Sequence, residues 1–252
     1  MLVDAVDVLS VTTADGIAIL TMNRPAQRNA MSSELVDRLI AILLALDENA
    51  AVRAVLLEGA GPGFCAGSDL AGLAGMTDGE RSRFEAESGR LARLIAQVGI
   101  PVVAAVQGFA IGGGLTLAAA CDIVVTEPTA RWSLPEVPIG LFPAWGLGIV
   151  AGRTGRPTAR RLSWGIDTLD GTEAVRLGLA DQLADGPVRD AALGIAQRLA
   201  VLPSAQATAV KRYFAADPHG EEADMVANRL FMQATRSPEA IESFRRFAAK
   251  RR

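Results

Sequence analysis

An uncharged stretch from Leu94 to Cys121 is the feature that most constrains how this chain folds. It contains no Asp, Glu, Lys or Arg, and three consecutive glycines, Gly112 to Gly114, interrupt it. About 20 apolar residues are enough to cross a bilayer. However, Pro101 and the glycines divide this stretch, and no second candidate span or flanking basic cluster accompanies it. We therefore expect a buried strand, a glycine turn and a buried helix, and no membrane segment.

The composition points away from several classes of protein. Of the 252 residues, 50% are hydrophobic and 21% are charged, as in a folded globular chain. The net charge of −3 argues against a nucleic-acid-binding surface, which carries a basic excess. Two cysteines without metal-ligand spacing and a single histidine indicate no metal site, and suit buried thiols in a reducing compartment. Asp4 and Asp7 stand where a secretory signal would be positive, so we expect a cytoplasmic protein.

Short runs rich in β-branched residues alternate with longer amphipathic segments. Strands are predicted over 16–22, 51–59, 101–108 and 121–126, and a helix over 32–49. A second helix should run from Thr77 to about 97, because Thr77 and Glu80 fit a capping box. This alternation predicts an α/β fold with parallel strands. The chain changes character near residue 195, which indicates a core over 1–195 and a C-terminal helical region over 196–252.

Two glycine-rich turns follow predicted strands, at 58–70 and 107–114. Backbone N–H groups left free at such turns can bind an anion or the oxygen of a polarised carbonyl, although glycines there also serve tight turns alone. Neither turn contains the G-x-G-x-x-G pattern of a dinucleotide site. A serine-hydrolase elbow is also missing, and His219, the only histidine, lies in a polar turn. A shared oxyanion-binding site is the function that these turns suit.

Glu136 lies in a segment dominated by apolar and aromatic residues, 130–148. Loss of solvation there would raise the pKa of its carboxyl and let it exchange protons near neutral pH. Trp145 in the same segment either narrows a pocket or belongs to the core. An exposed loop glutamate is the alternative for Glu136 taken alone.

Four motifs taken together resemble the enoyl-CoA hydratase/isomerase (crotonase) family. They are "NRPAQRNAMS" at 23–32, "FCAGSDL" at 64–70, "PVVAAVQGFAIGGGLTLAAACD" at 101–122 and "WSLPEVPIGLFP" at 132–143. The resemblance implies a crotonase-like stack of ββα units with a C-terminal helical region for trimerisation and capping. It also implies an acyl-CoA thioester as substrate, no separate cofactor, and assembly as a homotrimer or a dimer of trimers.

The resemblance also implies roles for individual residues. The oxyanion-hole N–H donors fall on Ser68 and Gly113, and the proton-transfer group falls on Glu136. The backbone that holds the adenine falls on Ala66, Asp69 and Leu70. Arg24 and Arg28 are candidates for binding the CoA phosphates, although either could be a plain surface charge.

The chain departs from the family pattern at Thr116, where typical hydratases carry a first glutamate two residues after the triple glycine. Threonine can hydrogen-bond a water but cannot act as a base at neutral pH. A single carboxylate, Glu136, can still move a proton from one carbon to another. Double-bond isomerisation and hydration or dehydration therefore both remain open. A non-catalytic acyl-CoA carrier on the same fold, or another family reaction such as decarboxylation or thioester hydrolysis, is the alternative.

Overall fold

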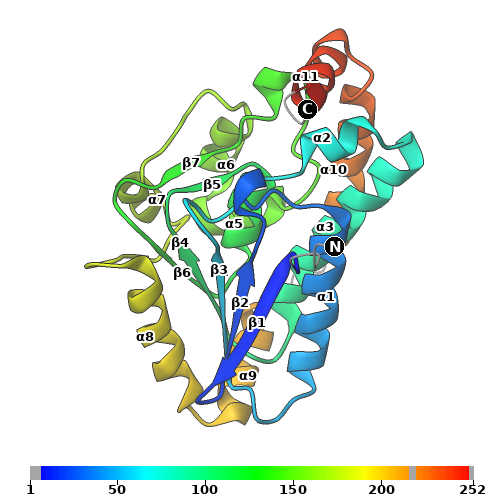
Figure 1. Ribbon diagram of the computed structural model, residues 1–252. Helices are drawn as coiled ribbons and strands as arrows, with labels where there is room; N and C mark the ends of the chain where they lie inside the picture. Colours follow the sequence, from blue (N-terminus) through cyan, green and yellow to red (C-terminus); the bar gives the residue numbers. More distant parts are fainter. Residues whose placement is uncertain (1–6, 216–219, 250–252) are drawn as a thin grey trace.

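A computed structural model describes residues 7–215 and 220–249 (Figure 1), so Asp4 and His219 lie outside the described residues. Within this part of the chain, a six-stranded sheet has the order β1-β2-β3-β4-β6-β8. Its strands are β1 (Leu9–Ala14), β2 (Ile17–Met22), β3 (Ala54–Gly59), β4 (Val102–Val106), β6 (Ile123–Thr126) and β8 (Gln182–Leu183). β1 runs antiparallel to β2, and the other neighbours are parallel.

Helices cover both faces of this sheet, as Figure 1 shows for α8 (Val188–Ala200) on one side and α1 (Ser33–Asp47) and α3 (Asp78–Gln97) on the other. Successive residues of a strand point to opposite faces. In β3, Ala54 and Leu56 accordingly belong to the apolar cluster under α8, and Val55 and Leu57 to the larger cluster that α1 and α3 share. The predicted α/β fold with parallel strands is confirmed.

The starts of the two predicted long helices are confirmed by their caps. Ser32 Oγ accepts a hydrogen bond from the backbone N–H of Leu35 at 3.3 Å, at the start of α1. Thr77 and Glu80 form the expected capping box at the start of α3. These bonds satisfy N–H groups that have no partner within the helix.

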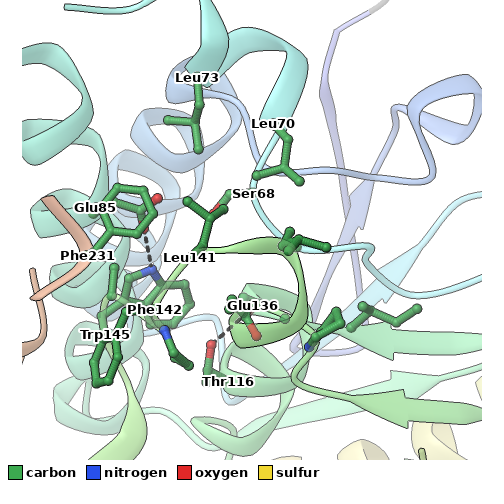
Figure 2. A pocket seen from close by; sticks show the side chains of 18 of the residues that line it. Ser68, Leu70, Leu73, Glu85, Thr116, Glu136, Leu141, Phe142, Trp145 and Phe231 are labelled. Atoms are coloured by element: carbon green, nitrogen blue, oxygen red, sulfur yellow. Dashed lines mark hydrogen bonds between the residues drawn. The ribbon is translucent and has the colours of Figure 1, made fainter. Parts of the chain in front are cut away.

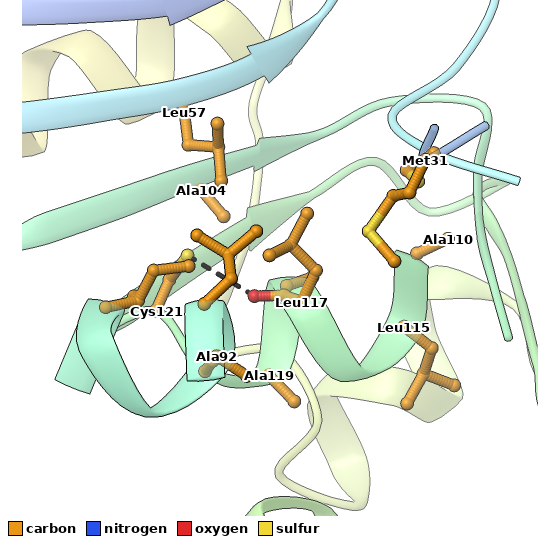
Figure 3. Close-up of a cluster of buried hydrophobic side chains, with 14 of the residues drawn as sticks. Met31, Leu57, Ala92, Ala104, Ala110, Leu115, Leu117, Ala119 and Cys121 are labelled. Atoms are coloured by element: carbon orange, nitrogen blue, oxygen red, sulfur yellow. Dashed lines mark hydrogen bonds between the residues drawn. The ribbon is translucent and has the colours of Figure 1, made fainter. Parts of the chain in front are cut away.

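The uncharged stretch folds as a strand, a turn and a helix. β4 is followed by a short strand, β5 (Phe109–Ile111), and by α4 (Gly113–Ala119). Figure 3 shows Leu115, Leu117 and Cys121 packed into the core beneath β3 and β4, and all three are at most 2% exposed. In the described residues, no helix has the length and apolar character needed to cross a membrane.

A second layer of short extended segments lies beside the main sheet. β5 pairs in parallel with β7 (Arg131–Ser133), and single bridges extend the layer through Met31–Ser68, Cys65–Ala110 and Trp132–Leu169. β5 and β7 are not predicted from the sequence, because three residues carry too little periodicity to be recognised. This layer carries the loops from which the candidate site is built.

The remaining helices lie at the edges of the core. They are α2 (Leu70–Ala74), α5 (Leu147–Thr154), α6 (Arg156–Ser163), α7 (Gly171–Arg176), α9 (Ser204–Phe214), α10 (Gly220–Ala234) and α11 (Pro238–Ala249), with single 3-10 turns at Pro25–Gln27 and Val137–Ile139. α10 packs against α3, and α11 packs against α2. The boundary expected after residue 195 falls inside α8, which packs on β3 and β4.

Candidate active site

A cavity of about 70 Å³ lies where the second layer meets α3 and the C-terminal helix α10 (Figure 2). It is lined on one side by apolar side chains, among them Leu73, Leu141, Phe142 and Phe231. It also brings together most of the residues proposed from the sequence: Ala66, Ser68, Leu70, Gly113, Thr116, Glu136 and Trp145. Segments separated by more than a hundred residues therefore meet at one place.

Two residues that line this cavity, Ser68 and Gly113, have backbone N–H groups without an acceptor among the described residues. Met31 N–H donates to the carbonyl of Gly67 at 2.8 Å, and Asp69 N–H donates to the carbonyl of Met31 at 2.9 Å. In such a parallel bridge the N–H of Ser68 points away from Met31. In the described part of the chain, neither this N–H nor that of Gly113 donates a hydrogen bond. Both are available to a ligand in the cavity.

The loop that carries Ser68 touches the turn that carries Gly113. A Cβ built on Gly67 would lie 3.2 Å from Gly113 N and 2.8 Å from the carbonyl oxygen of Ile111. Gly67 also has a positive φ of 89°, a conformation that side chains disfavour. A Cβ on Gly114 would lie 2.2 Å from the carbonyl oxygen of Cys65. Glycine at these positions therefore allows the two N–H donors to lie close together.

Glu136 follows β7 and points its carboxyl at the same cavity. Its Oε1 lies 2.7 Å from the position that a Cβ on Gly112 would take. Its Oε2 is buried and has no hydrogen-bond partner among the described residues. Burial raises the pKa of this carboxyl to about 7, because the charged form loses its solvation. A carboxyl with such a pKa can both accept and donate a proton at neutral pH.

A second carboxyl of the cavity, Glu85, was not identified from the sequence. It lies on α3, is 3% exposed, and its Oε2 accepts a hydrogen bond from Trp145 Nε1 at 3.0 Å. Burial raises the pKa of Glu85 to about 8, and the charge of Glu136 also raises it. Hydrogen bonds from Trp145 and Ser68 act in the opposite direction and lower this pKa. The spacing of residues in α3 could have indicated that Glu85 is buried, because it lies on the same helical stripe as the buried residues Ser88, Ala92 and Ile95.

Comparison with known proteins identifies the family. The model of the enoyl-CoA hydratase/isomerase family matches residues 12–252. The chain belongs to the enoyl-CoA hydratase/isomerase family. A probable enoyl-CoA hydratase of Mycobacterium bovis is 31% identical over 243 residues, which cover 93% of this chain and 92% of that protein. A short-chain-enoyl-CoA hydratase of Clostridium acetobutylicum is 32% identical over 171 residues, covering 67% of this chain and 66% of its own.

Solved structures of the enoyl-CoA hydratase/isomerase family share the fold. The crystal structure of an enoyl-CoA hydratase/isomerase from Mycobacterium paratuberculosis superimposes with a TM-score of 0.86 at 27% identity. The match covers 96% of this chain and 99% of the other. The crotonase-like architecture with C-terminal helices, expected from the sequence motifs, is confirmed.

Thr116 lies where the resemblance places the first glutamate of a hydratase. It is 2% exposed, and its hydroxyl donates to the carbonyl of Gly113 at 3.0 Å, within the first turn of α4. Its oxygen therefore faces the cavity chiefly as an acceptor. In this member of the enoyl-CoA hydratase/isomerase family, α4 contributes no carboxylate to the cavity.

Three residues proposed for the CoA moiety do not line the cavity. Arg24 and Asp69 form an ion pair at 2.9 Å, with side chains only 10% and 11% exposed. Asp69 also caps α2 by accepting from Gly72 N–H at 3.1 Å. Arg28 stacks its guanidinium over the ring of Phe109 at 4.2 Å. Arg24 and Asp69 thus hold the loop around Ser68, and their binding of CoA stays a prediction, as it does for Arg28.

Proposed function

We propose that this protein is an enzyme that binds an acyl-CoA thioester, polarises its carbonyl with the N–H groups of Ser68 and Gly113, and moves protons with Glu136. The observation that carries the proposal is the unpartnered, buried Oε2 of Glu136 beside two unpaired N–H donors. Buried polar atoms are nearly always hydrogen-bonded. Three unsatisfied groups around one cavity therefore suit a ligand that satisfies them.

Removal of a proton next to the thioester carbonyl builds negative charge on the carbonyl oxygen. Two fixed N–H dipoles stabilise that charge more than they stabilise the neutral substrate, which is the requirement for catalysis. Removing one such donor typically costs about 10²–10³ in rate. Glu136 takes the proton as a carboxylate and is left as a carboxylic acid, which can donate a proton in turn.

The reaction is the isomerisation of an enoyl-CoA double bond or the addition or removal of water. Thr116 in place of a carboxylate favours isomerisation, because α4 then supplies no acid–base group beside Glu136 to activate a water. The coenzyme A is part of the substrate, and we propose no further cofactor. A non-catalytic carrier would need the two N–H donors but not a desolvated Glu136.

The size of the cavity supports a short acyl group. Its volume of about 70 Å³ is small beside the roughly 300–1,000 Å³ of a typical ligand pocket. Leu141, Phe142 and Phe231 close it with apolar surface. The relative from Clostridium acetobutylicum is named a short-chain-enoyl-CoA hydratase. We therefore propose an acyl chain of few carbons.

We also propose that the protein assembles as a homotrimer or a dimer of trimers. Apolar side chains stand exposed along α9 and α10, among them Val210, Tyr213, Phe214, Val226 and Leu230. On α9, Val210 and Phe214 line one hollow together with Leu202 and Ile149. Contiguous exposed apolar surface usually marks a protein interface.

The test is turnover in D₂O with 2-enoyl-, 3-enoyl- and 3-hydroxyacyl-CoA, comparing the unmodified protein with Glu136→Gln. We expect product formation and deuterium exchange to fall at least about 10²-fold in Glu136→Gln. The control is Glu87→Gln, the same change on the half-buried face of α3, which should leave the rate unaltered. Normal turnover by Glu136→Gln would exclude this residue as the base. Tight binding of CoA esters with no exchange at all would favour the carrier.

A further inference from the structure

We propose that Glu85 is a second proton-transfer group of this site, supplying a proton to the acyl group while Glu136 removes one. The inference rests on the function proposed above and adds a residue that the family resemblance does not assign. It concerns a carboxyl that α3 brings into the cavity from a different element than the one carrying Glu136 (Figure 2).

The geometry places Glu85 within the reacting site and not behind it. Its carboxyl and that of Glu136 both line the cavity, as do Ser68 and Gly113. The indole of Trp145 joins the two sides, because Nε1 donates to Glu85 at 3.0 Å while Cζ2 lies 3.1 Å from the Cβ position of Gly113. An acyl group bound in this cavity would therefore have Glu85, beside Trp145, among the residues that surround it.

The described residues that line the cavity supply no positive charge to compensate two carboxylates. Among the described residues that line the cavity there is neither a lysine nor an arginine. Arg93, farther along α3, forms an ion pair with Asp224 of α10. Arg81, one turn before Glu85 on α3, donates to the carbonyl of Leu73 and forms an ion pair with Asp78. The groups that shift the pKa of Glu85 are the neutral Trp145 and Ser68 and the acidic Glu136. Ionising both carboxyls of such a buried pair without a counter-ion is unfavourable, so one of the two carboxyls stays protonated.

The two carboxyls differ in how firmly each holds that proton. Burial raises the pKa of Glu85 to about 8 and that of Glu136 to about 7. Because the charge of an ionised Glu136 raises the pKa of Glu85, Glu85 is the group that keeps a proton while Glu136 is the carboxylate. Pairs of titratable groups whose environments separate their pKa values in this way typically divide the acid and base roles between them.

A purely structural role for Glu85 requires only a hydrogen-bond acceptor for Trp145. Glutamine would provide that acceptor through its amide oxygen and would avoid the cost of a buried ionisable group. A carboxyl is needed only if the proton moves. Glu85→Gln therefore separates the two roles while it keeps the volume and the Trp145 hydrogen bond.

The step balances without an oxidant or reductant. The Glu136 carboxylate removes a proton from the α-carbon of a 3-enoyl thioester, and the electron pair of that C–H bond moves onto the thioester oxygen at Ser68 and Gly113. As the double bond shifts to the 2-position, the carboxylic acid of Glu85 gives its proton to the γ-carbon. Glu136 is then protonated and Glu85 ionised, and exchange with water restores the starting state.

The experiment is a single turnover of a short 3-enoyl-CoA by the full chain in D₂O, with the γ-carbon of the product analysed by NMR. With two groups, the γ-carbon receives deuterium from Glu85, which has equilibrated with solvent. In Glu85→Gln we expect the rate to fall roughly 10²-fold. The residual product should carry the substrate's own proton, returned by Glu136. Glu87→Gln, two residues along the same helix, is the control and should match the unmodified protein in rate and label.

Several outcomes would overturn the inference. Unchanged rate and unchanged label in Glu85→Gln would leave Glu85 as a positioning residue for Trp145. A higher KM with the same label would make it a binding group. Circular dichroism and CoA-ester binding of Glu85→Gln show that a lost rate is not a lost fold. Glu136→Gln tests the proposed function separately from the role of Glu85. Normal turnover by Glu136→Gln would show that Glu136 is not the base, whatever the result for Glu85→Gln.

Discussion

The carboxyl of Glu136 occupies the space that a side chain at Gly112 would need. A Cβ on Gly112 would lie 2.7 Å from Glu136 Oε1, and the backbone of Gly112 has a positive φ of 57°. Glycine at this position therefore does two things, because it permits the turn before α4 and leaves room for the carboxyl. The triple glycine and the glutamate, which lie more than twenty residues apart, form one unit of the site.

We expect Gly112→Ala to displace Glu136 and to lower kcat at least about 10-fold, because one ångström of misplacement can cost about 10²-fold. It should also lower the free energy of unfolding by about 1–3 kcal/mol through backbone strain. Steady-state kinetics and urea denaturation measure the two effects. Gly152→Ala in α5 is the control, because nothing lies within 4 Å of its Cβ position. Full activity in Gly112→Ala would contradict the steric coupling.

Stability should fall with rising pH because of Glu85. An unfolded glutamate ionises around its ordinary pKa of 4.5, whereas burial keeps Glu85 protonated in the folded state to about pH 8. Between these values the folded state binds more protons than the unfolded state, so the free energy of unfolding decreases as pH rises. Glu85→Gln should therefore stabilise the protein relative to the unmodified chain at pH 8, by an amount on the order of a few kcal/mol, and not at pH 4.

Urea denaturation of both proteins at pH 4, 6 and 8 measures this difference. Glu87→Gln provides the comparison, because the side chain of Glu87 is 37% exposed and pairs with Arg90 at the surface. A difference between Glu85→Gln and the unmodified protein that stays constant with pH would mean that Glu85 titrates normally.

The sequence allowed the main features of the fold to be predicted, because they depend on local patterns. Capping residues such as Ser32 and Thr77 mark helix starts independently of tertiary contacts. The uncharged stretch could be assigned to the core because its glycines break a membrane helix. β5 and β7 were missed, since strands of three residues are defined by their pairing and not by their own periodicity.

The residues of the candidate site could be predicted from the sequence where a single motif contains the functional residue. Ser68, Gly113 and Glu136 were assigned by resemblance, and they meet at the cavity. Glu85 was missed because its place on the buried stripe of α3 does not reveal that this stripe meets the segment of Glu136. The burial of Arg24 against Asp69 was equally invisible, since a contact over 45 residues depends on how the loop around Ser68 folds.

The exposed apolar side chains of α9 should be buried in the assembled protein. Phe214 is 81% exposed and Val210 is 61% exposed in the single chain. We expect sedimentation to give three or six chain masses, and Phe214→Asp to shift the protein toward smaller species, because a charge in an apolar interface is costly. Arg198→Asp on α8 is the control at a polar exposed position. A monomer at micromolar concentration in the unmodified protein would contradict the proposed assembly.

Thr116 should influence the addition of water more than it influences proton exchange. Its hydroxyl donates to the carbonyl of Gly113, which leaves its lone pairs as the only side-chain polar group of α4 that can hold a water in the cavity. Thr116→Val keeps the branched shape and removes the hydroxyl. We expect hydration of a 2-enoyl-CoA to fall about 3- to 10-fold, as for the loss of one hydrogen bond of about 1 kcal/mol, with a smaller loss of α-proton exchange. Parallel assays of hydration by absorbance and of exchange by NMR give the ratio of the two rates. If both rates fell equally, Thr116 would act on the shape of the oxyanion turn and not on a bound water.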